Sequence, residues 1–399
     1  MDFLNTLRKE SDPLADEVIR NLIENNLLET TNRILFSLEK NNSKAEELPA
    51  ALKEFLAQTS QLPSWADPKK IKKAQELFAV YGLEISLILF CKSLPQSYCC
   101  PKGVKVLHST GRLSKDPTFN KFTRRVMETS RFVMNVLSEN SFGDEGSGIV
   151  TIQKVRLLHA SIRYYLKKHS WDSPTLGEPI NQQDMLGTLM SFSALVIEGL
   201  EMLNINWNNE EKDAYIHCWN IAGHILGVKP DFLPHNYEEA ISLGNLIFDD
   251  QKGYSKEGQE MAEALVSFIH YILPGNLLDG MAENMICFLL GEENIKYIGL
   301  KKEEDFLEKR LPVIYKLMGG ISDELKDNSK LIKTIAKPFS KMILQGILLS
   351  YNDHKGPVIL IPPSLQENWQ LKTIWKNIIS SPALFGKRFT IQKNENSFD

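Results

Sequence analysis

Apolar side chains recur every three to four residues along almost the whole chain, and this period constrains the fold more than any other feature. In residues 14–29 the apolar positions form one stripe on a helix: Leu14, Val18, Ile19, Leu22, Ile23 and Leu27. Eleven further segments repeat the pattern: 46–58, 69–93, 117–138, 151–169, 183–203, 209–226, 236–249, 256–272, 278–291, 303–318 and 323–350. The stretches between them contain loop-forming residues such as Pro63, Gly103 and Pro274. We therefore expect an all-α chain.

Two short stretches carry a different local signal. The apolar run Gly356–Pro362 (GPVILIP) resembles a strand, and prolines bracket it. The pair Asp116-Pro117 is typical of a helix N-cap followed by proline in the first turn. The sequence therefore predicts one short strand at most, near the end of the chain.

Charge and composition exclude several classes of protein. The 46 basic and 50 acidic residues give a formal net charge of −4, so the chain lacks the basic excess of a nucleic-acid-binding protein. The first thirty residues contain no apolar core of a signal peptide, and no window holds about 18 uninterrupted apolar residues. The five cysteines form no CxxC pair, which is typical of a reducing compartment. We expect a soluble, cytoplasmic protein without a transmembrane segment or a nucleic-acid partner.

One histidine lies between two arginines on the predicted helix 151–169. Arg156, His159 and Arg163 follow an RxxHxxxR spacing, which places both guanidiniums within one helical turn of the imidazole and on the same side. Buried arginines need anionic or hydrogen-bonding partners. One interpretation is a haem site, with the imidazole on the iron and the guanidiniums on the propionates. The other is a core histidine beside two arginines in ordinary salt bridges.

Two further helices carry polar groups that could belong to a site. Arg125, Glu128 and Thr129 share one face of the predicted helix 117–138, either as a pocket wall or as a solvated charged surface. Asp213, His217 and His224 share a face of helix 209–226 and could bind a metal with ligands from elsewhere, or serve the structure. No HExxH motif, phosphate-binding glycine loop or GxSxG elbow supports another chemistry.

Together these segments resemble a known family, the MpaB-type oxygenases, which include the latex-clearing proteins or rubber oxygenases. The resemblance covers roughly residues 85–250 and weakens towards residue 300. It rests on five motifs in order. The first is an opening signature made of Leu94–Tyr98 (LPQSY) and Val106–Leu113 (VLHSTGRL). The others are Arg124–Thr129 (RRVMET), the RxxHxxxR of His159, Asp184–Phe192 (DMLGTLMSF) and Tyr215–Gly227 (YxxxWxxAGxxLG).

The resemblance implies an all-α fold with a globin-like core around one b-type haem. It makes His159 the proximal ligand of the haem iron, and it makes Arg156 and Arg163 residues that shape the haem surroundings. On the distal side the rubber oxygenases carry an arginine, followed three and four residues later by a lysine and a threonine. Arg125 and Thr129 match this pattern, whereas Glu128 occupies the lysine position. Glu128 cannot act as the same iron ligand, but a carboxylate can act as a base or accept a hydrogen bond.

The resemblance also implies a domain organisation: an N-terminal helical extension (1–68), a haem-binding catalytic domain (69–300) and a C-terminal helical extension packed on the core (301–399). The implied reaction is oxidative cleavage or oxygenation of an isoprenoid or lipid-like double bond by O₂. We expect an apolar pocket for the alkene, with these lining residues: Met127, Met190, Phe192 and Leu195. Two alternatives stay open, a haem protein that senses or carries oxygen without turnover and a haem-free helical binding module.

Overall fold

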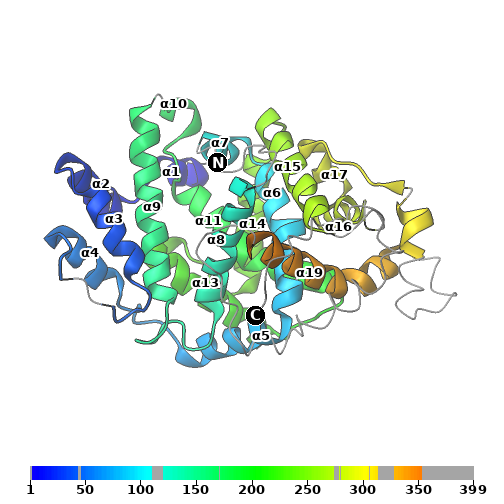
Figure 1. Cartoon of the computed structure of the whole chain (residues 1–399), viewed down its shortest axis with the longest axis horizontal. Helices are drawn as coiled ribbons and strands as arrows, with labels where there is room; N and C mark the ends of the chain where they lie inside the picture. Colours follow the sequence, from blue (N-terminus) through cyan, green and yellow to red (C-terminus); the bar gives the residue numbers. More distant parts are fainter. Residues whose placement is uncertain are drawn as a thin grey trace, which may run out of the picture.

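The computed structural model describes residues 2–43, 46–109, 120–169, 171–273, 278, 280–304, 306–312 and 328–352. These residues form helices joined by turns and loops, with no strand among them (Figure 1). The longer α-helices are α1 (Asp2–Lys9), α2 (Pro13–Glu24), α3 (Leu28–Ser37), α4 (Ala50–Thr59), α5 (Pro68–Ile88), α7 (Pro101–Ser109), α8 (Asn120–Leu137), α9 (Gly148–Lys168), α11 (Gln182–Phe192), α12 (Ala194–Met202), α13 (Asn209–Leu226), α14 (Tyr237–Gln251), α15 (Lys256–Ile272), α16 (Met281–Leu290) and α19 (Asn328–Asn352).

Short helical pieces connect several of these helices. They are the π-helical segment η1 (Leu89–Ser93), α6 (Leu94–Tyr98), α10 (Ser173–Leu176), η2 (Pro230–Phe232), α17 (Glu292–Ile295), η3 (Lys296–Ile298) and η4 (Phe306–Arg310). The all-α fold expected from the apolar period is thus confirmed. The expected strand at Gly356–Pro362 and the expected N-cap at Asp116-Pro117 lie outside the described residues.

Side-chain caps explain where the helices around the centre begin. The Asn181 side chain accepts a hydrogen bond from the Asp184 backbone N–H at the start of α11. Asn208 and Glu211 form a capping box at the start of α13, and Gly227 ends that helix in the left-handed conformation, with φ of 100°. These signals are local in the sequence, which is why the predicted bounds of helix 209–226 agree with those of α13.

Local signals gave wrong bounds at other places. The segment predicted as one helix over 14–29 ends at Glu24, and α3 begins at Leu28. The segment predicted as one helix over 183–203 is two helices, because the backbone breaks at Ser193, with φ of −114° and ψ of −86°. Gly103 was expected in a loop but lies inside α7. A β-carbon at Gly103 would come within 3.9 Å of the Asp184 side chain, so this position lies close to α11.

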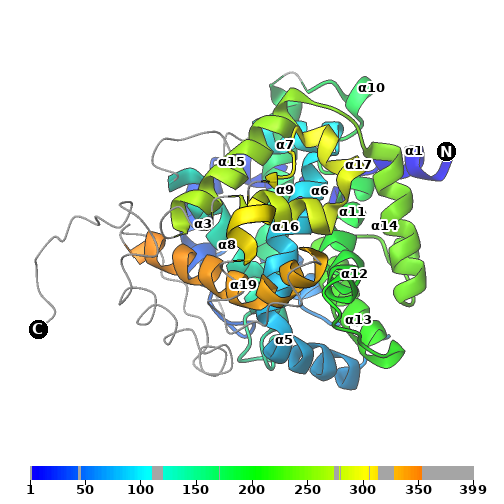
Figure 2. The same cartoon turned by 90° about the vertical axis from the view of Figure 1, so that its right-hand side faces the viewer.

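The helices pack around a centre formed by α5, α11 and α13. Helix α13 contacts α5 on one side and α9 on the other, and α11 contacts both α13 and α14. Figure 2 shows α19 lying across the same side of the molecule as α16, and α19 also contacts α5 and α15. A β-carbon at Gly346 would lie 2.5 Å from the Ile272 carbonyl oxygen, so glycine at this position allows α19 to approach α15 closely.

The buried apolar residues form two clusters. The larger one runs through the centre and includes Leu4 and Leu7 of α1 as well as Ile343 and Ile347 of α19. The smaller one joins α2, α3 and α4 to the outer face of α9, where Figure 1 shows these helices side by side. Helices from both ends of the chain therefore contribute to the packing around the centre.

Two helical stretches are long and apolar enough to cross a membrane. They are Pro68–Tyr98 and Gln182–Met202, and 67% and 61% of their most apolar windows are buried inside the fold. Helices in the core of a folded domain carry the same composition, because they are surrounded by other helices. Their apolar character is thus accounted for by the packing of α5 and of α11 with α12.

Candidate active site

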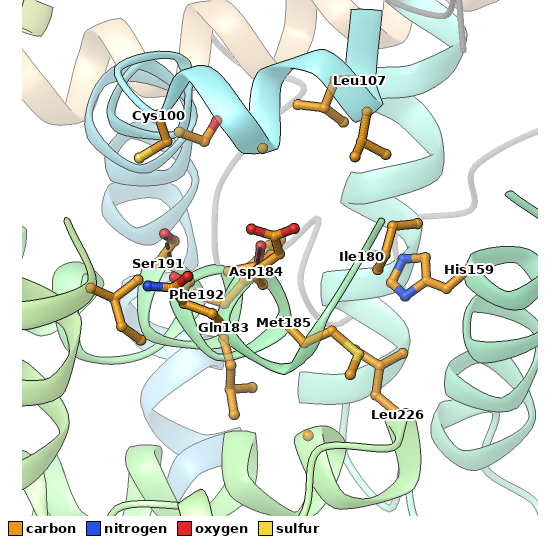
Figure 3. A pocket seen from close by; sticks show the side chains of 18 of the residues that line it. Cys100, Leu107, His159, Ile180, Gln183, Asp184, Met185, Ser191, Phe192 and Leu226 are labelled. Atoms are coloured by element: carbon orange, nitrogen blue, oxygen red, sulfur yellow. Dashed lines mark hydrogen bonds between the residues drawn. The ribbon is translucent and has the colours of Figure 1, made fainter. Parts of the chain in front are cut away.

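A cavity of about 270 Å³ lies at the centre of the fold, and we call it the first cavity. Its walls come from α6 to α9 and from α11 to α14, so residues far apart in the sequence meet there. Most of the lining side chains are apolar, as is typical of sites for small molecules and cofactors. Figure 3 shows His159 on one side of this space, with Asp184 and Cys100 farther along it.

His159 presents its ring to the first cavity from α9 (Figure 3). Its Nδ1 atom is buried and has no hydrogen-bond partner among the described residues. Burial, together with the positive charges of Arg163 and Arg125, lowers the pKa of His159 to about 3. The imidazole is therefore neutral at physiological pH and has a lone pair for a metal ion.

The two arginines that flank His159 have carboxylate partners from the N-terminal helices. Arg156 donates to both oxygens of Asp12, with Nε–Oδ2 at 2.7 Å and Nη2–Oδ1 at 2.8 Å. Arg163 Nε donates to Asp16 Oδ1 at 2.6 Å. Neither guanidinium is among the described residues that line the first cavity. The structure therefore favours the salt-bridge interpretation of the two arginines. Their anionic partners are Asp12 and Asp16, which the sequence alone did not identify.

Arg125 lies at the boundary between the first cavity and a second one. The second cavity has a volume of about 230 Å³, and its wall includes Ser340, Ile343, Leu344 and Ile347 of α19. Arg125 lines both cavities, whereas Thr129 lines the second. The two cavities share six lining residues: Ser97, Leu107, Arg125, Thr188, Ser191 and Phe192. They are therefore neighbours separated by a thin wall of side chains.

Glu128 is not among the described lining residues of either cavity. Its side chain is 38% exposed and forms ion pairs with Arg124 at 3.2 Å and with Arg125 at 3.8 Å. Thr129 Oγ1 donates to the Arg125 carbonyl oxygen at 3.1 Å. The structure thus brings Arg125 and Thr129 to the cavities and places Glu128 behind Arg125.

The four residues expected around the alkene separate into two pairs. Phe192 lines both cavities and Leu195 lines the first. Met127 and Met190 are buried in the core, with 4% and 0% of their surface exposed, and they are not among the described lining residues. Their role there is packing.

The polar residues of α13 serve the structure rather than a metal site. His217 Nε2 accepts a hydrogen bond from the Asp67 backbone N–H at 2.9 Å, and Asp213 Oδ1 accepts one from the Tyr237 N–H at 3.1 Å. His224 packs edge-on against Trp65. In the described part of the chain, no group of three or more His, Cys, Asp or Glu side chains is placed to hold a metal ion.

A polar group that sequence reasoning missed lies at the far end of the first cavity. Gln183, Asp184 and Gln251 line this end, together with the Cys100 thiol. Arg8 of α1 donates to Asp184 Oδ1 at 3.0 Å and to Gln183 Oε1 at 2.9 Å. Burial raises the pKa of Asp184, although the Arg8 guanidinium acts in the opposite direction. Asp184 belongs to one of the motifs in the sequence, whereas no local signal marks Gln251.

The donor set of the first cavity fits a haem. A neutral imidazole with an unpartnered ring nitrogen faces a mainly apolar space, which is the environment of a proximal histidine. His159 would hold the iron of a haem bound in this cavity. A mononuclear site of this kind needs one protein ligand, so it agrees with the lack of a multidentate metal cluster among the described residues.

Comparisons with known proteins show which family this chain resembles. Residues 103–318 match the family described as "ER-bound oxygenase mpaB/B'/Rubber oxygenase, catalytic domain". The chain is 24% identical over 320 residues to the rubber oxygenase of Streptomyces sp. (strain K30), which covers 79% of this chain and 76% of that protein. Its fold is similar to that of latex clearing protein in the closed state, with a TM-score of 0.67, 22% identity and coverage of 91% and 89% of the two chains. Since the match covers more than half of its length, this chain belongs to the mpaB and rubber oxygenase family.

Proposed function

We propose that this chain is a haem-dependent oxygenase that uses O₂ to cleave or oxygenate a double bond of an isoprenoid or lipid-like substrate. The observation that carries the proposal is the neutral, unpartnered imidazole of His159 at the wall of a mainly apolar cavity. Membership of the family and the name of the Streptomyces relative support an oxygenase reaction on an unsaturated hydrocarbon. When bound, the haem supplies an iron centre at which O₂ can be bound and activated.

The residues around His159 hold its ring in place. Arg156 and Arg163 lie one turn before and after it on α9, and their salt bridges tie this helix to α2. Because both arginines and Asp12 are buried, any rotation of α9 would break charged hydrogen bonds. We assign Arg156 and Arg163 the role of fixing the direction in which His159 points.

The second cavity is our candidate for the substrate's hydrocarbon chain. It is mainly apolar along α5, η1 and α19, and it meets the first cavity at Arg125. Arg125 offers positive charge at this boundary, and Thr129 offers hydroxyl lone pairs there. Glu128 contacts Arg125 from outside the cavities, so we assign it a positioning role. An apolar cavity beside the charged Arg125 side chain suits a hydrocarbon whose reacting double bond lies near this residue.

The proposal is tested by the absorption spectrum of the full chain expressed with ample haem. A Soret band shows that haem is bound, and O₂ consumption with carbonyl products from a polyene shows turnover. A Soret band without O₂ consumption would point to an oxygen sensor or carrier. Protein without any Soret band would overturn the haem proposal.

A pair of histidine variants tests the ligand. His159→Ala should lose the Soret band, because it removes the imidazole at the cavity. His169→Ala is the matched control, since His169 follows the same helix and is exposed. Full haem content in His159→Ala would show that another residue holds the iron.

A further inference from the structure

We propose that the far end of the first cavity is a subsite for a hydroxyl group, so that the substrate is an unsaturated alcohol rather than a pure hydrocarbon. The subsite consists of Gln251, Gln183 and Asp184, which lie on α14 and α11. The inference rests on the proposed function, because the ligand it describes is the substrate of that reaction.

Gln251 provides the main observation. Its side chain lines the cavity and is 7% exposed, yet its Oε1 atom has no hydrogen-bond partner in the described part of the chain. The Nε2 atom donates to Asp250 Oδ2 and to Gln183 Oε1. Both partners are acceptors, so the amide cannot be turned around, and its oxygen stays unpaired. A buried amide oxygen in this position favours a ligand that donates a hydrogen bond.

The neighbouring polar groups are already engaged. Gln183 accepts from Arg8 at 2.9 Å and donates to Asp250 at 2.8 Å. Asp184 accepts from Arg8 at 3.0 Å and from Asn181 Nδ2 at 3.0 Å. The Gln251 oxygen is therefore the acceptor of these three side chains that has no partner among the described residues.

The charges at this end also select against an anionic ligand. Arg8 reaches it from α1, and its guanidinium is held by Asp184, by Gln183 and by the Leu176 carbonyl. A carboxylate or phosphate would lie beside the Asp184 carboxyl and the unpaired Gln251 oxygen. A neutral alcohol meets neither repulsion, and its O–H supplies the missing donor.

One face of α11 leads from this subsite to the second cavity. Asp184, Thr188 and Ser191 are spaced i, i+4 and i+7, which places them along one side of the helix. All three line the first cavity, and Thr188 and Ser191 also line the second. The distance along the helix from Asp184 to Ser191 is about 10 Å. An occupant with its hydroxyl at Gln251 can therefore extend its apolar part along this face towards Arg125.

Calorimetric binding to the haem-loaded full chain tests the subsite without requiring turnover. The ligands are geraniol, its methyl ether, which cannot donate a hydrogen bond, and geranic acid at pH 8, which is an anion. We expect geraniol to bind about tenfold more tightly than the ether, as for one buried hydrogen bond, and geranic acid to bind least. Equal affinity for alcohol and ether would overturn the proposal, because water would then satisfy Gln251 equally well.

A variant of the same size assigns the effect to Gln251. In Gln251→Leu the alcohol and the ether should bind alike, whereas Gln58→Leu, at an exposed glutamine of α4, should keep the preference. A preference that survives in Gln251→Leu would overturn the assignment. The wild-type comparison stands even if this variant does not fold. A missing Soret band would overturn the proposed function. Equal binding of the alcohol and the ether by protein with an intact Soret band would overturn the subsite alone.

Discussion

Asp12 accepts two hydrogen bonds from Arg156, at 2.7 and 2.8 Å. Arg156 lies one helical turn before His159. Asp12 and Arg156 are 144 positions apart in the sequence, and both are buried. Arg163 reaches Asp16 on the next turn of the same N-terminal helix. Helix α2 and its N-cap are thus joined to α9 by two salt bridges, one on each side of His159. A first prediction follows from this arrangement.

Asp12→Ala should destabilise the protein by about 3–5 kcal/mol, because it leaves the buried Arg156 guanidinium without its carboxylate. The free energy of unfolding of a typical domain is roughly 5–15 kcal/mol, so this loss is a large part of it. Urea unfolding at pH 7 measures the change. Glu17→Ala is the control on the same helix, since Glu17 pairs with Arg20 at the surface, and its effect should stay below about 1 kcal/mol. Equal effects of Asp12→Ala and Glu17→Ala would contradict a stabilising role of the buried salt bridge between Asp12 and Arg156.

The sequence predicted the helices whose ends carry local signals. Helices 209–226 and 256–272 have the predicted bounds, because Asn208 and Ser255 cap them and Gly227 ends the first. The break at Ser193 was not predictable in this way. Its surroundings are apolar and helical in pattern. Both α11 and α12 contact α14 and η1, and they differ in their other neighbours, which include α1 and α13 for α11 and α5 for α12.

The candidate site was predictable only in part. His159 and Arg125 could be singled out, since each lies in a local pattern that a helix brings onto one face. Asp12 and Asp16 could not be identified as the partners of the arginines, because the pairing depends on how α2 docks on α9. The unpaired oxygen of Gln251 depends on three helices meeting, so no spacing in the sequence indicates it.

A second prediction concerns pH. Burial raises the pKa of Asp184 above its value in the unfolded chain, so the folded state binds this proton more tightly. Its contribution to stability is therefore fully present below the unfolded pKa of about 3.9, and it is lost as the pH rises through the folded pKa. Asp184→Asn cannot ionise and should lose less stability than the wild type between pH 4 and pH 8.

Unfolding by urea at several pH values in this window measures the difference between the two proteins. Asp249→Asn is the control, because the Asp249 side chain is 65% exposed at the end of α14. This control should follow the wild-type curve. If the curve for Asp184→Asn runs parallel to the wild-type curve, burial does not raise the pKa of the Asp184 carboxyl.

A third prediction concerns the wall that α19 gives to the second cavity. Ile347→Phe should reduce the space for a hydrocarbon chain, because Ile347 lines this cavity and is 2% exposed. We expect kcat/KM for a long polyene to fall by about tenfold or more, while a short one is turned over normally. Overpacking can also cost about 1–3 kcal/mol, so the unfolding midpoint is measured in parallel.

Lys330→Ala, at an exposed position of the same helix, is the control for this wall and should leave both substrates unaffected. Equal losses for long and short polyenes in Ile347→Phe would indicate a general disturbance of the fold. Such a result would remove α19 from the substrate site.

The last prediction separates Arg125 from Glu128. Arg125 lines both cavities, whereas Glu128 reaches Arg125 by an ion pair of 3.8 Å from outside them. Arg125→Ala should therefore lower kcat by about a hundredfold or more, as removal of a charge at a reacting centre does. Glu128→Gln keeps the shape but weakens the contact that orients Arg125, so its loss should be about tenfold or less. Single-turnover rates on the haem-loaded protein compare the two, with Arg131→Ala, at an exposed position of the same helix, as the surface control. A larger loss in Glu128→Gln than in Arg125→Ala would mean that the carboxylate itself takes part in the reaction.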